Sequence, residues 1–165
     1  MQKLRTIYLG GGCFWGLEEM FRTLTGVVDT EIGYSGGEVE NPTYQNHEGN
    51  AEALKITFDE SIISYSQILD YFFRVHNPTT KNRQGNDVGT SYRSVIFYQN
   101  QEEKTDAENM IDVVNKSGKW IDPVATTLEE FKKFYDAEDY HQDYLVKNQG
   151  GYTCHELYFD ESFKK

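Results

Sequence analysis

The amino-acid sequence predicts an α/β (α+β) fold: a two-layer sandwich whose mixed sheet has a split βαβ, ferredoxin-like core, followed by an irregular C-terminal tail. Three observations predict it. Short segments alternate apolar and polar residues as strands do, apolar stripes with helical spacing separate them, and the two kinds follow one another as β-α-β-β-α-β. The chain has 165 residues, a length typical of one domain, so we expect residues 1–165 to form a single domain.

The first half of the sequence supplies a β-α-β unit. Residues 6–9 are typical of a strand, and three glycines follow them. Apolar side chains then recur at i, i+3, i+4 and i+7 over residues 17–24, the pattern of a helix with one buried face. Gly26 is expected to stop this helix. Residues 28–34 alternate again and predict the second strand.

The second half continues with the same two patterns. Residues 54–58 alternate as a third strand, and residues 64–67 have capping-box spacing at the start of a helical stripe that runs to residue 73. Residues 95–98 predict a fourth strand and 107–114 a third helix. Beyond residue 127 the chain is acidic and aromatic, and we expect short helical segments there.

Composition limits the classes of function. The formal net charge is −11, which argues against a protein that must neutralise nucleic-acid phosphates. The longest apolar runs are far shorter than the roughly 20 residues that span a bilayer, and no apolar stretch of a secretory signal follows the first five residues. We therefore expect a soluble cytoplasmic protein that binds neither nucleic acid nor membrane.

Two cysteines, Cys13 and Cys154, are the sequence's candidates for redox chemistry. A structural disulfide is not expected in a reducing compartment, which leaves catalysis or idle burial. Cys13 follows the three glycines at a strand-to-helix junction. A helix N-terminus stabilises a thiolate, so we expect a lowered pKa there. The alternative is a small buried residue at a helix start.

Four further positions could assist such a thiol. Glu52 shares the parity of the apolar residues in the third strand, so its carboxyl should be buried, have a raised pKa and act as an acid. A strand-end glutamate turned to water is the alternative. Tyr44 and Tyr92 lie in two long polar loops, where phenols can donate hydrogen bonds to an oxygen, and Asp87 lies in the second loop. Each tyrosine could equally be a packing or surface residue.

Two large aromatics, Phe14 and Trp15, directly follow Cys13. Beside a nucleophile they could form an apolar pocket for a methyl group, or they could be ordinary core residues. The preceding glycines do not form a phosphate-binding loop, because Trp15 stands where a dinucleotide-binding pattern needs its third glycine.

The segment from Gly12 to Gly16 resembles the signature of the A-type peptide methionine sulfoxide reductases. The resemblance covers about nine-tenths of the chain, since further blocks follow in the order of that family. These blocks are residues 33–37, 41–44, 51–52, 76–79, 82–94, 137–142 and 151–154.

The resemblance implies a role for each candidate residue. Cys13 would attack the sulfoxide sulfur while Glu52 protonates or polarises the oxygen. The other implied roles are methyl binding by Phe14 and Trp15, hydrogen bonds from Tyr44 and Tyr92, and organisation of that network by Asp87. The reaction would leave a sulfenic acid on Cys13, which Cys154 would convert into a disulfide.

The resemblance also implies substrate and partners. The substrate would be the S epimer of methionine sulfoxide, free or in proteins, so that the activity repairs oxidised proteins. The Cys13–Cys154 disulfide would be reduced by thioredoxin, or by dithiothreitol in the test tube, without a cofactor or a metal. We expect the protein to act as a monomer.

The sequence departs from the family pattern in two places. The loop before Glu52 is short, and Asn50 stands where many members have a histidine, which puts loop contacts to the substrate in question. Some members carry two recycling cysteines near the C-terminus, whereas this chain has Cys154 alone, so we expect one disulfide without a relay. Gly150 and Gly151 suggest a mobile tail around it.

Three other functions fit parts of the sequence. A thiol hydrolase would need a histidine base near Cys13, and the chain offers four histidines. A peroxidase would share the sulfenic-acid stage but would not need an aromatic methyl pocket. A non-enzymatic binding module would keep its activity without Cys13. The histidines show no close ligand spacing, so a metal site is not expected.

Overall fold

The computed structural model describes residues 1–163 and contains the predicted split βαβ sheet. Its four inner strands are β1 (Leu4–Gly11), β2 (Val27–Ser35), β3 (Ala51–Asp59) and β6 (Ser94–Tyr98). They lie in the order β6-β1-β3-β2, and each neighbouring pair is antiparallel. This order places β3 between the two strands of the first β-α-β unit, which confirms the predicted ferredoxin-like core.

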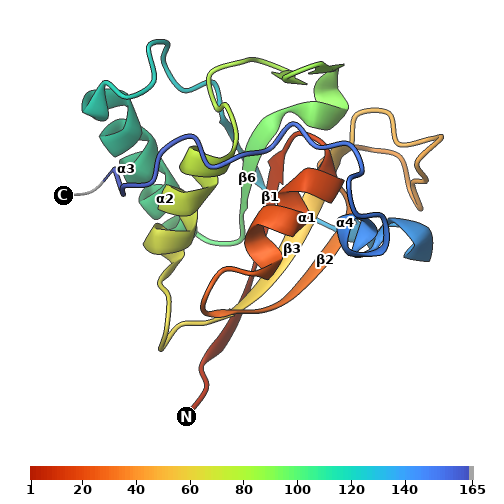
Figure 1. Cartoon of the computed structure of the whole chain (residues 1–165), viewed down its shortest axis with the longest axis horizontal. Helices are drawn as coiled ribbons and strands as arrows, with labels where there is room; N and C mark the ends of the chain where they lie inside the picture. Colours follow the sequence, from red (N-terminus) through yellow and green to blue (C-terminus); the bar gives the residue numbers. More distant parts are fainter. Residues whose placement is uncertain (164–165) are drawn as a thin grey trace.

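The helices form the second layer (Figure 1). Helices α1 (Phe14–Arg22) and α2 (Tyr65–Val75) connect the inner strands, and α3 (Gln101–Ser117) packs beside α2. The main core lies between these helices and the sheet, and it contains Leu54, Ile56 and Phe58 of β3. The opposite face of the sheet carries a smaller cluster that includes Ala51, Ala53 and Phe97, with Phe131 and Phe134 packed against it. The predicted two-layer sandwich is confirmed.

The segment after residue 126 forms two edge strands that the sequence did not predict. Strand β7 (Thr127–Glu130) pairs with β6 in parallel, and β8 (Phe134–Asp136) pairs with β2 in the antiparallel sense. The expected short helical segments are present farther along, but these two strands precede them. Four- and three-residue strands leave little periodicity to read, and pairing with the sheet edges overrides local preference. Short helical segments do follow: η2 (Asp139–His141) and α4 (Tyr144–Lys147).

Helix α1 ends before the predicted stop signal. Arg22 is its last residue and Thr23 its C-cap, so Gly26 does not terminate the helix. Gly26 has a φ of +101° in the turn before β2, and a Cβ on it would lie 2.5 Å from Cγ2 of Ile63. This glycine is therefore required by the turn and by the close approach of Ile63.

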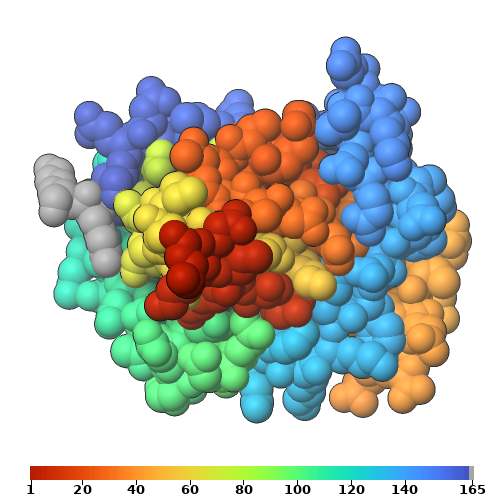
Figure 2. Space-filling view, turned by 90° about the horizontal axis from the view of Figure 1, so that it is seen from below, coloured from red at the N-terminus to blue at the C-terminus, as the bar shows by residue number. Residues whose placement is uncertain are grey.

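Two segments outside the sheet pack near the N-terminal end of α1: the second polar loop and the C-terminal tail. The predicted second polar loop contains a small hairpin, β4 (Arg83–Gln84) and β5 (Asp87–Val88), and then the turn η1 (Thr90–Tyr92). The C-terminal tail leaves α4, crosses in front of α1 and ends beside α2 and α3 (Figure 1). Figure 2 shows α4 at one end of the molecule and the last part of the tail at the other.

The tail is anchored to α2 by hydrogen bonds that its backbone N–H groups donate to a carbonyl and to a side-chain carboxylate of the helix. The Tyr158 N–H donates to the Arg74 carbonyl at 2.8 Å, and the Phe163 N–H donates to Oδ2 of Asp70 at 2.9 Å. Phe163 is buried in the main core. None of the helices within residues 1–163 combines the length and the apolar character that crossing a membrane requires.

Helix α2 begins with the predicted capping box. The Ser64 hydroxyl accepts from the Gln67 N–H at 3.1 Å, and the Gln67 side chain accepts from the Ser64 N–H at 2.9 Å. Ser64→Ala removes the first bond, and we expect it to lower the free energy of unfolding by about 1 kcal/mol, the usual value of such a cap. Urea unfolding measures this. Ser66→Ala inside the same helix is the matched control and should cause no comparable loss.

Candidate active site

Cys13 occupies the N-cap position of α1, directly after β1. Its side chain is buried, with 7% exposure, and the N–H groups of Trp15 and Gly16 face its sulfur. These two amides belong to the first turn of the helix, whose N–H groups have no partner within the helix. The predicted junction is therefore present, and it aims hydrogen-bond donors at the thiol.

The pKa of Cys13 is nevertheless raised, which corrects the expectation of a lowered value. Burial is the largest cause, and the negative charges of Glu52 and Asp87 add to it. The two helix amides act in the opposite direction but are outweighed. In the resting protein Cys13 is a neutral thiol, because burial destabilises the thiolate more than the helix amides stabilise it.

Close packing explains the glycine that precedes Cys13. Gly12 has a φ of +91°, and a Cβ on it would lie 2.6 Å from Cγ of Gln84 in β4. The Gln84 side chain is held by the backbone of Asn77. Its Oε1 accepts the Asn77 N–H at 2.9 Å, and its Nε2 donates to the Asn77 carbonyl at 2.8 Å. The β4–β5 hairpin thus rests directly on the backbone that carries Cys13.

Glu52 is buried with the apolar residues of β3, as its parity predicted, and is only 1% exposed. Its Oε1 accepts the Phe14 N–H at 3.1 Å, whereas its Oε2 has no hydrogen-bond partner among residues 1–163. Burial raises the pKa of Glu52 to about 8, although the Phe14 N–H works against this and Asp87 adds to it. The side chain is therefore a protonated acid near neutral pH, and it is bonded to the amide of the residue that follows Cys13.

Two phenols lie near this pair. Tyr44 is in the loop before β3 and Tyr92 is in η1, and each is partly exposed. Burial raises the pKa of both, and the charges of Glu52 and Asp87 raise it further. Both phenols consequently remain protonated and able to donate. The same charge interactions indicate that the predicted tyrosines and acids share one site.

The aromatic residues after Cys13 have different surroundings. Phe14 is fully buried against Tyr34 and His141. Trp15 is only half-buried, stacks on Tyr144 of α4 at 3.8 Å between ring centroids, and donates from Nε1 to Nδ1 of His141 at 2.9 Å. Helix α4 thus supports one face of Trp15.

The sequence did not single out His141 as part of this aromatic group. Its ring lies between Phe14, Trp15 and Tyr44, and burial lowers its pKa. Because Nδ1 accepts from Trp15, the neutral ring carries its proton on Nε2, which has no partner among residues 1–163. A buried donor without a partner is unusual in a folded protein, and here it lies among the aromatics that flank Cys13.

Glu138 holds the loop that carries Tyr44. Its Oε2 accepts the Tyr44 N–H at 3.1 Å, and its Oε1 accepts the Tyr34 hydroxyl at 2.9 Å. The short loop is closed at its end by Asn50, whose Oδ1 accepts the Gly37 N–H at 3.0 Å. Asn50 therefore has a structural partner inside the loop at the position where a histidine was expected from the family pattern.

Cys154 lies in the tail where the tail crosses the β4–β5 hairpin. It is half-buried, and both cysteines are free thiols. Next to it, Nε2 of His155 contacts the Gly11 carbonyl at 2.6 Å, so the tail is hydrogen-bonded to the strand end that leads to Cys13. The tail is thus docked in this structure. Its predicted mobility remains a prediction.

The histidines considered as bases for a hydrolase differ in their partners. Nε2 of His155 contacts Gly11 and Nε2 of His76 contacts Ser94 at 2.8 Å, whereas Nε2 of His141 has no partner among residues 1–163. Within residues 1–163, the acidic, histidine and cysteine side chains form no group of three that could hold a metal ion.

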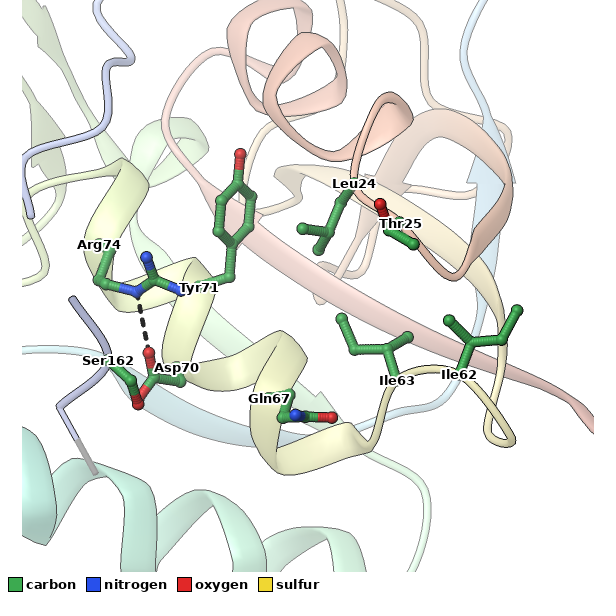
Figure 3. Close-up of a pocket in the computed structure, with 9 residues that line it drawn as sticks. All are labelled: Leu24, Thr25, Ile62, Ile63, Gln67, Asp70, Tyr71, Arg74 and Ser162. Carbon is green, nitrogen blue, oxygen red and sulfur yellow. Dashed lines mark hydrogen bonds and ion pairs between the residues drawn. The ribbon is translucent and has the colours of Figure 1, made fainter. Parts of the chain in front are cut away.

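A separate surface pocket lies between the end of α1 and helix α2 (Figure 3). Its lining contains none of the site residues described above. Its buried carboxylate, Asp70, pairs with Arg74 at 2.9 Å and also accepts from Ser162 and Phe163 of the tail. The charged groups there are used to anchor the tail.

Comparison with known proteins identifies relatives over nearly the whole chain. A profile of the family described as peptide methionine sulfoxide reductase matches residues 5–164. The peptide methionine sulfoxide reductase MsrA 1 of Mesorhizobium japonicum is 52% identical over 147 residues, which cover 89% of this chain and 86% of that protein.

Two solved structures of one yeast protein have the same fold. The reduced form of Mxr1 from Saccharomyces cerevisiae has a TM-score of 0.87 at 37% identity, covering 94% of this chain and 92% of that one. Mxr1 in complex with Trx2 has a TM-score of 0.66 at 29% identity, covering 94% and 90%.

The raised pKa of Glu52 predicts a pH-dependent stability. The carboxyl titrates near 4.5 when unfolded and near 8 when folded, so between these values the folded protein binds more protons and its free energy of unfolding falls as pH rises. Glu52→Gln removes this titration. We expect the free energy of unfolding of the wild type minus that of the variant to decrease from pH 5 to pH 8 and then to level off.

Urea unfolding at each pH measures that difference. Glu108→Gln on the exposed face of α3 is the matched control, and its difference from wild type should stay flat over the same range. A flat difference for Glu52→Gln as well would mean that the carboxyl is not held in its neutral form.

Proposed function

The chain belongs to the peptide methionine sulfoxide reductase family, and we propose that Cys13 is the nucleophile with which it reduces the S epimer of methionine sulfoxide, free or in proteins. The family membership itself assigns reduction of methionine sulfoxide to this enzyme. The single observation that supports the assignment of residues is the Glu52 carboxyl, buried and bound to the amide that follows Cys13.

The first step joins an acid and a thiol across the sulfoxide. A sulfoxide sulfur is a poor electrophile until its oxygen is protonated or strongly hydrogen-bonded, and the unpaired Oε2 of protonated Glu52 supplies that proton. Tyr44 and Tyr92 donate to the same oxygen. Asp87 organises the network by its charge.

In the same step the sulfoxide oxygen is transferred from the substrate to Cys13. Cys13 attacks the sulfoxide sulfur and forms an S–S bond to it. The protonated oxygen then moves to the Cys13 sulfur as the S–O and S–S bonds to the substrate sulfur break, and methionine leaves. Cys13 now carries the hydroxyl as a sulfenic acid, and the proton lost by the thiol restores Glu52. Phe14 and Trp15 form the apolar wall for the substrate methyl. Trp15 is half-buried and therefore leaves part of its ring accessible, whereas Phe14 is fully buried.

Cys154 completes the cycle in the second step. Its thiol displaces hydroxide from the sulfenic acid and forms a single Cys13–Cys154 disulfide, which an external dithiol reduces by exchange. The structure of the yeast relative in complex with Trx2 supports thioredoxin as that reductant. Dithiothreitol replaces it in the test tube, and the cycle uses no prosthetic group.

We also propose the setting in which this activity operates. Residues 1–165 act as one domain, which the match over residues 5–164 supports. The enzyme works as a monomer in the cytoplasm, where thioredoxin keeps thiols reduced and methionine residues of oxidised proteins are repaired.

The test of the reaction is reduction of the separated S and R epimers of N-acetylmethionine sulfoxide by dithiothreitol. We expect turnover of the S epimer alone and no turnover of it by Cys13→Ser, since a hydroxyl is a far weaker nucleophile than a thiolate. Equal turnover of both epimers would contradict the proposed handedness. Retained activity in Cys13→Ser would remove Cys13 as nucleophile.

The test of recycling is Cys154→Ser with thioredoxin, thioredoxin reductase and NADPH. We expect one equivalent of methionine per enzyme and then a stall, because the sulfenic acid on Cys13 has no thiol to attack it. Following methionine and NADPH separately distinguishes a single turnover from no reaction. Sustained NADPH consumption by this variant would contradict the role of Cys154.

A further inference from the structure

The second step requires Cys154 to lose a proton, and its surroundings oppose that loss. Burial raises the pKa of the Cys154 thiol, and the charge of Asp87 raises it further. Thiolate, not thiol, attacks a sulfur centre, so a neutral Cys154 needs a group that accepts its proton as the S–S bond forms.

Two acceptors are in contact with the Cys154 sulfur. Oδ2 of Asp87 lies 3.8 Å from Sγ, and Nδ1 of His155 lies 3.9 Å from it. Both distances are within the range of hydrogen bonds that involve sulfur. The two groups differ in what protonation costs.

His155 is the poorer acceptor. Its Nε2 contacts the Gly11 carbonyl at 2.6 Å and must carry the ring proton, which leaves a lone pair on Nδ1. Taking a second proton at Nδ1 would place a new positive charge at a buried position, away from water. Asp87 by contrast loses a charge when it is protonated, next to a sulfur whose own charge is developing.

The chain is built to hold Asp87 against this sulfur. Asp87 lies in β5, and the hairpin turn at Gly85 packs so closely on the tail that a Cβ there would lie 3.2 Å from Cβ of Cys154. The Tyr152 hydroxyl also donates to Oδ2 of Asp87 at 3.3 Å, which fixes the carboxylate from the tail side. The same hairpin contacts Gly12 through Gln84.

We propose that Asp87 is the general base of disulfide formation, in addition to its role in the first step. It takes the proton from Sγ of Cys154 as that sulfur attacks the Cys13 sulfenic acid. The S–O bond of Cys13 breaks, the S–S bond forms, and the proton passes to the leaving hydroxide to give water. Cys13 sulfur is reduced and Cys154 sulfur is oxidised, so the step needs no other oxidant.

This inference rests on the proposed function, and single-turnover kinetics separates the two. Reduced enzyme is mixed with the S epimer of N-acetylmethionine sulfoxide without reductant. Methionine release reports the first step, and loss of free thiols together with trapping of sulfenic acid by dimedone reports the second. Absence of methionine from the wild type would sink the proposed function, independently of Asp87.

The decisive variant is Asp87→Asn, with Asp87→Glu as the conservative partner. Because Asp87 also serves the first step, we expect Asn to slow methionine release as well, but to slow disulfide formation about 100-fold more, the usual lower range for losing a general base, so that dimedone-reactive Cys13 accumulates. Glu should recover much of the disulfide rate. Asp122→Asn removes the same charge at an exposed position outside the site and should change neither step.

Three outcomes would overturn the proposal. One is disulfide formation by Asp87→Asn within threefold of wild type. Another is equal slowing of both steps, which would mean that Asp87 acts on the site as a whole. The third is a folded Asp87→Glu variant that forms the disulfide no faster than Asp87→Asn. A glutamate carboxylate should restore a general base, so equal rates would mean that Asp87 does not act as one.

Discussion

The hydrogen bond from the Phe14 N–H to Oε1 of Glu52 is the interaction on which the site depends. It joins the first turn of α1 to the buried face of β3, and it uses one oxygen of the carboxyl while the other stays unpaired. Burial would otherwise leave both oxygens without partners, a costly arrangement. Because the donor is the backbone N–H of the residue after Cys13, the bond ties the Glu52 carboxyl to the chain segment that carries the nucleophile.

The tail and the β4–β5 hairpin are organised around the same junction. Gly12 leaves room for Gln84 of the hairpin, and Gly11 supplies the carbonyl that His155 of the tail contacts. Larger residues at Gly12 would push the hairpin away and with it Asp87. The two proposed half-reactions therefore share one strand end: the acid approaches Cys13 from β3, and the resolving thiol approaches it from the tail.

Periodicity and capping predicted most of the fold, because the four inner strands and the three long helices bury regular stripes. The parity of Glu52 with Leu54 and Ile56 even predicted a buried acid. Strands β7 and β8 escaped prediction because they exist through pairing with sheet edges. The contacts of His141 and His155 also escaped it, since they join segments more than 120 positions apart whose proximity no local pattern encodes. The pKa of Cys13 was misjudged because the expectation considered the helix N-terminus and left out the burial of the sulfur, which is the larger effect.

The neutral state of Cys13 has a chemical consequence. Thiolates are the species that oxidants attack, so a buried thiol with a raised pKa resists adventitious oxidation when no substrate is present. In the proposed reaction the substrate itself supplies what the resting site lacks. Its oxygen takes the proton of Glu52, and its sulfur becomes electrophilic only then, so thiol ionisation and attack occur together. A preformed thiolate would be more reactive but less selective, and the burial that this fold imposes favours selectivity.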